Sequence, residues 1–172
     1  MNAEAGENKI TVLLVEPGKK PYAKKIENTL HALQHEVGGY IEVVYPYEDM
    51  VALVCHDEGK LEGMPLNRAL RDSEGHIYDV VAGTFFITGL SQDDFSSLSD
   101  DLLQKYANLF HQPEMFIQIN GKIVVLPMEE YEEKPNAFKS KPLSESIQAA
   151  VSQASNPISE SHMNGPEQKF ER

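Results

Sequence analysis

Residues 115–126 read MFIQINGKIVVL, two apolar runs that flank Asn120 and Gly121. An Asn-Gly pair between such runs is the strongest short-range signal for a two-residue β-hairpin. The strands of a hairpin pair antiparallel, so at least part of the sheet is expected to be antiparallel. In this register one face of the hairpin can pack on a core, and it is made of Met115, Ile117, Val124 and Leu126.

Further strands are predicted on the N-terminal side of this hairpin. The runs at 10–15, 40–45 and 51–55 are short, apolar and rich in β-branched residues, which indicates buried strands. Residues 77–87 hold two short apolar pieces around Ala82 and Gly83. This pattern predicts one strand with a bulge or kink at the glycine.

Two amphipathic helices are predicted between the strands. Pro21 is expected to begin the first helix and Gly38 to end it, because proline suits the first turn and glycine the C-terminus. The apolar stripe of this helix is Tyr22, Ile26, Leu30, Leu33 and Val37. Ser91 and Asp94 have capping-box spacing ahead of the second helix. The stripe of the second helix is Phe95, Leu98, Leu102, Tyr106, Leu109 and Phe110.

The order of these elements predicts an α+β fold, with the two amphipathic helices packed on one face of a mainly antiparallel sheet. Residues 9–128 are expected to form this single domain, after a disordered N-terminus at 1–8. From residue 129 the sequence turns acidic, with seven serines between 140 and 161 and few large apolar residues. A segment of that composition cannot offset its ordering entropy, so residues 129–172 are predicted to be a disordered tail.

The composition excludes several classes of protein. The 172 residues include 15 Lys and Arg against 27 Asp and Glu, which gives a net charge of −12. Direct binding to a nucleic-acid backbone would need a basic stripe, so it is not expected. One cysteine, Cys55, excludes a disulfide scaffold and a multi-cysteine zinc site. No apolar run approaches the ~18 residues of a membrane span, and the N-terminus lacks a signal-peptide pattern. These features predict a cytoplasmic protein that makes no membrane contact.

Two basic stretches are candidate contacts for an anion. Lys19 lies between a predicted strand and a predicted helix start, where free amides attract anions; an ordinary turn with solvated lysines is the alternative. Arg68 and Arg71 are three residues apart, so on a helix they could share a face and bind phosphate or carboxylate. The alternative is local ion pairing, with Asp72 among the nearby acids.

An acidic cluster surrounds the predicted start of the second helix, made of Asp93, Asp94, Asp100 and Asp101. Acidic side chains at that place complement the helix dipole, which is the simpler interpretation. The alternative is an acidic surface that imitates nucleic-acid phosphates and occupies a DNA-binding protein.

The residues give little support for an enzyme. Cys55 and His56 are neighbours on a predicted strand and should point to opposite faces, so Cys55 is expected to be a small core residue. Catalysis would need Asp79, Glu16 or His56 to converge in a cleft. We expect no metal, no cofactor and no enzymatic activity.

Four motifs resemble one protein family: VEPGKKPY (15–22), GGYIEVVYP (38–46), PLNRALRD (65–72) and AGTFFITG (82–89). The chain resembles the domain of unknown function family DUF3846 over roughly residues 10–110. The family has no established activity, and the resemblance implies an accessory protein of bacterial mobile elements and phages. We hypothesise that the residues matching the polar motifs of the family bind a ligand: Glu16, Lys19, Tyr22, Asn67, Arg68, Arg71 and Asp72.

Together these observations predict a non-enzymatic accessory protein of the counter-defence type, which sequesters an anionic small molecule or a host protein. In the small-molecule version, Lys19 and the amides near Pro21 form one wall of a pocket. Arg68 and Arg71 form the other wall, and Asn67 orients the ligand. The alternative is an acidic nucleic-acid mimic that inhibits a host restriction or defence enzyme.

Overall fold

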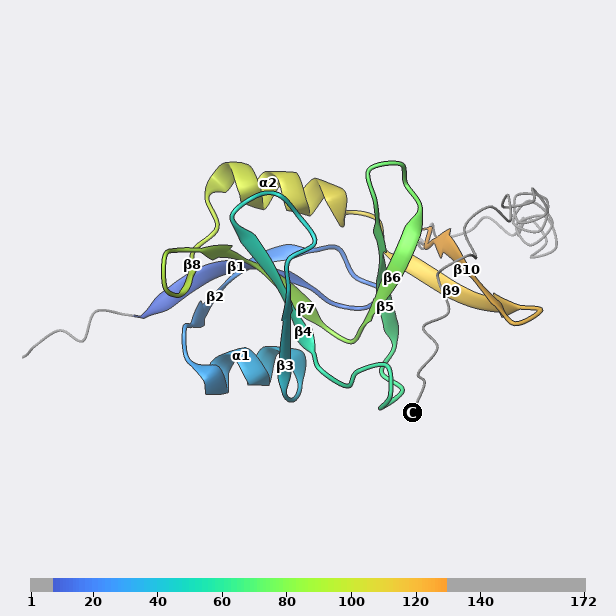
Figure 1. Cartoon of the computed structure of the whole chain (residues 1–172), viewed down its shortest axis with the longest axis horizontal. Helices are drawn as coiled ribbons and strands as arrows, with labels where there is room; N and C mark the ends of the chain where they lie inside the picture. Colours follow the sequence, from blue (N-terminus) through green and yellow to red (C-terminus); the bar gives the residue numbers. More distant parts are fainter. Residues whose placement is uncertain (1–7, 130–172) are drawn as a thin grey trace, which may run out of the picture.

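The structure is a computed structural model that describes residues 8–129, so the predictions for 1–7 and for the tail beyond 129 lie outside it (Figure 1). The elements follow in the order β1 (Lys9–Val15), β2 (Tyr22–Glu27), α1 (Leu30–Val37), β3 (Ile41–Val44), β4 (Val51–His56), β5 (Leu66–Arg71), β6 (Ile77–Ala82), β7 (Phe85–Leu90), β8 (Phe95–Ser96), α2 (Asp100–Leu109), β9 (Glu114–Ile119) and β10 (Lys122–Pro127). Neither helix is long and apolar enough to cross a membrane.

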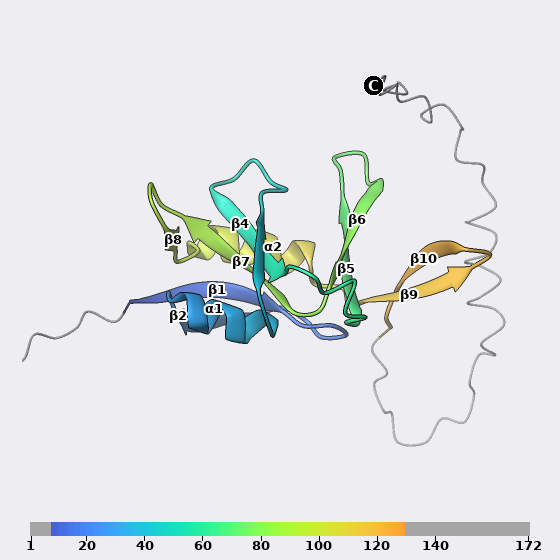
Figure 2. The same cartoon turned by 60° about the horizontal axis from the view of Figure 1, so that its bottom comes forward.

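The main sheet has six strands, in the order β2-β1-β7-β4-β3, with β8 paired to β7. Every strand pair in it is antiparallel. Two separate two-stranded sheets, β5–β6 and β9–β10, stand at one end of it (Figures 1 and 2). The predicted α+β class with a mainly antiparallel sheet is therefore confirmed.

The two helices cover opposite faces of the main sheet, so the expectation that both pack on one face is wrong (Figure 1). Leu33 and Val37 of α1 pack in a cluster with Val12, while Tyr106 of α2 packs in a second cluster with Leu13. The reason lies in the central strands. β1 and β7 are apolar at nearly every position, and side chains alternate between faces, so both faces need cover.

The first half of the first predicted helix is a β-strand, and only its second half is helical. Residues 22–27 form β2, which folds back on β1 so that Tyr22 lies opposite Leu14. Tyr22 and Ile26 are four apart, a spacing that puts two residues on one face of a strand as well as of a helix. α1 begins only after Thr29, whose side chain accepts the backbone N–H of Ala32, and it ends at Gly38 with φ 84°, as predicted.

The second helix starts later than its apolar stripe suggests. Ser99 caps α2 by accepting the backbone N–H of Leu102. Ser91 donates instead to the backbone carbonyl of Asp94, closing a turn ahead of β8, and Phe95 lies in that strand. Asp100 and Asp101 lie in the first turn of α2, where they complement the helix dipole.

Residues 77–87 form two strands in different sheets, where one kinked strand was predicted. β6 pairs with β5, whereas β7 lies at the centre of the main sheet. Gly83 joins them with φ 76°, and a Cβ there would lie 2.8 Å from Sδ of Met64. The left-handed backbone at Gly83 turns the chain from one sheet to the other, and the missing side chain leaves room for Met64.

The β9–β10 hairpin is confirmed. Asn120 (φ 50°) and Gly121 (φ 77°) both adopt the left-handed conformation that a two-residue I′ turn requires. Met115 pairs with Leu126, as the predicted register requires. Figure 2 shows this hairpin extending beyond β5, away from the main sheet.

Candidate functional site

Arg68 and Arg71 lie on strand β5, so the predicted shared helix face does not exist. Residues three apart on a regular strand point to opposite faces. The pairing of β5 with β6 shifts register between Leu70 and Arg71, and an irregularity of this kind re-aims a side chain. Both arginines consequently line one cavity of about 280 Å³, which Tyr47, Gln112 and Glu114 also line.

Arg68 is buried, with 2% of its surface exposed. Its Nε donates to the carbonyl of Phe110 (3.2 Å), and Nη1 donates to the carbonyl of Asn67 (3.1 Å) and to Oδ1 of Asn67 (2.9 Å). Nη2 donates to the carbonyls of Lys19 (2.7 Å) and Phe110 (3.1 Å). These five bonds match the five N–H donors of a guanidinium, so Arg68 has no donor left for a ligand.

The environment of Arg68 disfavours its charge. Desolvation lowers the pKa of Arg68 from its ordinary value, and the Glu114 carboxylate opposes that shift. The five bonds go to four oxygens, all of them neutral, so no carboxylate of residues 8–129 touches the guanidinium. Arg68 therefore joins the β1–β2 turn, β5 and the end of α2 as a buried, hydrogen-bonded cation.

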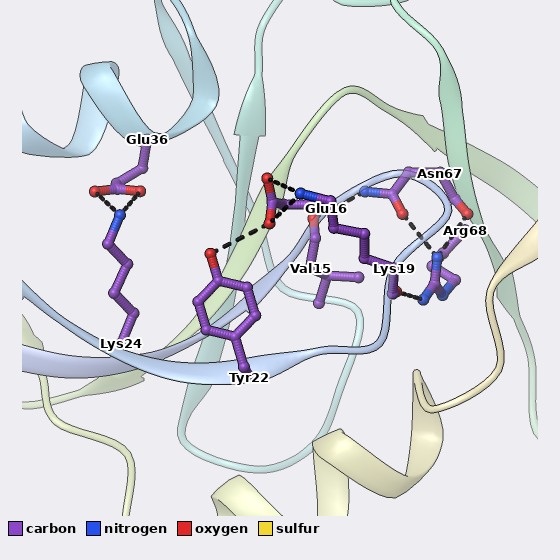
Figure 3. Close-up of polar contacts among 8 residues, drawn as sticks. All are labelled: Val15, Glu16, Lys19, Tyr22, Lys24, Glu36, Asn67 and Arg68. Atoms are coloured by element: carbon purple, nitrogen blue, oxygen red, sulfur yellow. Dashed lines mark hydrogen bonds and ion pairs between the residues drawn. The ribbon is translucent and has the colours of Figure 1, made fainter.

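Asn67 was predicted to orient a ligand. In the structure its side chain instead holds Arg68 and the neighbouring backbone in place. It is fully buried, and its Nδ2 donates to the carbonyl of Val15 (2.9 Å; Figure 3) and to that of Gly83 (2.8 Å). Its Oδ1 accepts from Arg68, so both ends of the amide are engaged within the protein.

Arg71 is paired with an acid that sequence spacing did not indicate. Its Nη2 lies 2.5 Å from Oε1 of Glu114, and Oε2 of Glu114 accepts the backbone N–H of Ala69 (2.7 Å). Glu114 follows Arg71 by 43 positions along the chain and belongs to a different hairpin. One carboxylate therefore neutralises Arg71 and also accepts a backbone N–H of β5, that of Ala69.

The side chains of the β1–β2 turn form a cluster of their own. Glu16 accepts from Nζ of Lys19 (3.3 Å) and from the hydroxyl of Tyr22 (3.2 Å) (Figure 3). Burial and the Glu16 carboxylate raise the pKa of Tyr22. Lys19 reaches Arg68 through its backbone carbonyl only, while its ammonium turns to Glu16. Pro21 precedes a strand, so the helix amides predicted there are absent.

Asp72 lies apart from the other candidate residues, in the turn between β5 and β6. Its Oδ1 accepts the backbone N–H groups of Glu74 and His76 (both 2.9 Å), and the bond from His76 is the main reason that the pKa of Asp72 is lowered. One ligand atom from each of Asp72, Glu74 and His76 could meet at a metal ion, but all three side chains are exposed and form a hydrogen-bonded turn.

The four aspartates of the acidic cluster lie within nine residues of one another and are exposed. Asp94 accepts from Nδ2 of Asn28 (3.1 Å) and from the backbone N–H of Phe95 (2.7 Å). The carboxylates of Asp93, Asp100 and Asp101 contact no cation among residues 8–129.

A second cavity of about 280 Å³ lies between β3–β4 and the β5–β6 hairpin, and sequence reasoning did not find it. His56 and Asp79 line it, whereas Glu16 is not among its lining residues. Nδ1 of the buried His56 accepts the backbone N–H of Glu58 (3.1 Å). Cys55 is buried as predicted, and burial followed by the Glu42 carboxylate raises its pKa to about 11, so the thiol is protonated and inert at neutral pH.

Comparison with known proteins gives one family match. The model of a family described as "Domain of unknown function (DUF3846)" matches residues 10–111, close to the range over which the motifs resemble it. Neither the curated proteins nor the solved structures contain a significant match.

Proposed function

The chain belongs to the DUF3846 family, and we propose that it is a non-enzymatic binding protein of a phage or mobile element. It sequesters a basic host protein in the cytoplasm of the host cell, and it does so with carboxylates. The description of the family names no activity, so the proposal rests on how this chain distributes its charges.

The single observation that supports the proposal is that most Lys and Arg side chains of residues 8–129 are engaged internally, while a group of acidic side chains is not. Within the part of the chain that the structure describes, these Lys and Arg side chains pair with carboxylates: Lys19–Glu16, Lys24–Glu36, Lys60–Asp79, Arg71–Glu114 and Lys105–Asp49. Arg68 is saturated by neutral oxygens. Asp93, Asp100 and Asp101 have no such partner among residues 8–129. An exposed group of like charges attracts a surface of opposite charge and steers its approach.

The acidic cluster suits a partner that ordinarily binds nucleic acid. Such a partner presents a stripe of Lys and Arg that neutralises phosphates. Four carboxylates at 93, 94, 100 and 101 can occupy part of that stripe in place of phosphates. A host restriction or defence enzyme that acts on DNA is a partner of this kind.

Competition with DNA tests this proposal. Host proteins captured on the immobilised chain are to be eluted with duplex DNA at constant ionic strength. We expect DNA to release the specific partner, because the acidic cluster and the phosphates compete for one basic surface. A partner retained at saturating DNA would show that the interaction does not imitate nucleic acid.

A small anion bound beside Arg71 is the second candidate function, and one observation favours it. Arg68 and Arg71 line the same cavity, and no carboxylate from residues 8–129 contacts Arg68. An anion there would have to compete with Glu114 for Arg71. Calorimetry against a nucleotide panel should then show binding that Glu114→Gln strengthens and Arg71→Gln weakens. No heat with any nucleotide for the parent protein and for Glu114→Gln would remove this candidate.

A further inference from the structure

β3 lies at one end of the main sheet, and no strand of residues 8–129 pairs with its outer edge. The N–H of Asp57 donates to the carbonyl of Tyr40 (2.9 Å), and β3 and β4 pair antiparallel from Ile41 opposite His56 onward. Hydrogen-bonded and non-hydrogen-bonded pairs alternate in such a ladder. The backbone N–H and C=O groups of Ile41 and Val43 therefore point away from β4, along the open edge.

The two edges of the main sheet differ in how they are protected. At the other edge, β2 carries Lys24, Lys25 and Glu27 within its six residues. Charged side chains on an edge strand discourage pairing with another chain. β3 reads IEVV and carries one charge, at Glu42. Tyr40 and Tyr45 flank it and are 77% and 64% exposed.

The cavity between β3–β4 and the β5–β6 hairpin opens beside this edge. Glu42 and Val44 of β3 form part of its wall, together with Leu53 and Cys55 of β4. Its polar lining includes Glu42 and Asp57, which contact no cation among residues 8–129, and Asp79, which pairs with Lys60. The cavity thus combines an apolar wall with carboxylates in excess over cations.

The pKa of Cys55, which lines this cavity, reflects the excess of carboxylates. After burial, the carboxylates of Glu42 and Asp79 are the next causes that raise the pKa of Cys55, and they outrank the opposing effect of Lys60. These two carboxylates therefore place negative charge beside the wall of the cavity. A cationic side chain beside β3 would be stabilised there, and an anionic one would be repelled.

We propose that the open edge of β3 and the adjoining cavity bind an extended segment of a partner protein by β-strand addition. Main-chain bonds form with Ile41 and Val43, and a Lys or Arg of the segment faces Glu42 and Asp57. A second copy of this chain is the less suitable occupant, because a chain of net charge −12 would place its own Glu42 near this acidic rim. The inference goes beyond the proposed function, since it uses none of the four aspartates.

Synthetic peptides of about nine residues test the site directly. The probe alternates lysine with valine, and its matched control alternates glutamate with valine. We expect the basic peptide to shift the amide resonances of Ile41 and Val43 and to slow their hydrogen exchange. The acidic peptide should bind at least about tenfold more weakly. No binding of the basic peptide at millimolar concentration would overturn the proposal.

Three variants separate edge pairing from general charge attraction. Val43→Pro removes an outward-facing N–H, which an edge strand tolerates, and should abolish binding while the far-ultraviolet spectrum is kept. Glu42→Gln should weaken binding by about three- to tenfold, and Glu27→Gln, the same change on β2, should leave it unchanged. Equal losses for Glu42→Gln and Glu27→Gln would overturn the proposal even if Val43→Pro failed to fold.

Discussion

The guanidinium of Arg68 donates two hydrogen bonds to one backbone carbonyl, that of Phe110, from Nε (3.2 Å) and from Nη2 (3.1 Å). Phe110 caps the end of α2, whereas Arg68 lies in β5. The remaining donors of the same guanidinium reach Asn67 and the carbonyl of Lys19 in the β1–β2 turn. This one side chain therefore joins three parts of the fold that are distant in sequence.

Arg68→Met tests this structural role, because it keeps an unbranched side chain and removes all five donors. The carbonyls of Phe110 and Lys19 would then be left without the guanidinium in a buried place. We expect a loss of about 3–5 kcal/mol in the free energy of unfolding, measured by urea denaturation. A loss below about 0.5 kcal/mol would show that water replaces the guanidinium at no cost.

Glu114 has two roles, and a pair of substitutions separates them. Glu114→Gln keeps an oxygen for the backbone N–H of Ala69 and removes only the ion pair with Arg71, whose side chain is 40% exposed. We expect it to cost about 1 kcal/mol or less. Glu114→Ala also leaves the N–H without its acceptor and should cost about 1–3 kcal/mol more. Equal losses for the two variants in urea denaturation would contradict the assignment.

Gly83 should be less replaceable than Gly121, although both have φ near 77°. A Cβ at Gly121 meets nothing within 4 Å, so Gly121→Ala should cost only the strain of the left-handed backbone, about 1 kcal/mol. Gly83→Ala adds the contact with Sδ of Met64 and should cost more. Thermal unfolding of both variants measures the difference. Equal melting temperatures would mean that Met64 moves aside freely.

Asp49 is expected to contribute to the loss in the free energy of unfolding at acid pH. It accepts from Nζ of Lys105 (2.5 Å) and from the hydroxyl of Tyr106 (2.8 Å), and these bonds, that from Lys105 first, lower its pKa. A carboxyl whose pKa is lower in the folded state stabilises the fold above its unfolded value and loses that effect as the pH falls.

The parent protein should therefore lose more stability than Asp49→Asn when the pH falls from 6 to below the ordinary Asp value of 3.8. Urea midpoints across this range measure the effect. Glu48→Gln, at an exposed side chain next in the chain, is the matched control and should follow the parent curve. Parallel curves for the parent and Asp49→Asn would contradict the expectation.

Features that depend on neighbouring residues were predictable from the sequence. The β9–β10 hairpin followed from Asn120-Gly121, and the end of α1 followed from Gly38. β3 and β4 were found within a residue or two at each end because their apolar runs are bounded by turn residues. The spacing of Tyr22 and Ile26 led to the wrong prediction of a helix, because a spacing of four fits a helix and a strand alike.

Features set by distant pairing were not predictable. Which face each helix covers depends on strand order, and no local pattern encodes that order. The partner of Arg71, Glu114, lies beyond the family match and has no spacing relation to it. The candidate set was brought together in part: Arg68 and Arg71 share a cavity, Glu16, Lys19 and Tyr22 form a separate cluster, and Asp72 stands alone. Whether any of them binds a ligand stays a prediction.

The central claim is that the acidic cluster binds a host partner. The measurement is the dissociation constant of the captured partner for the parent and for the fourfold variant with Asp93, Asp94, Asp100 and Asp101 changed to Asn. A control with Glu27, Glu48, Glu74 and Glu129 changed to Gln loses the same charge elsewhere on the exposed surface. We predict that the Asn variant abolishes binding, that the control retains it, and that the parent complex weakens strongly with salt. Unchanged binding by the Asn variant, at low and high salt alike, would contradict the account.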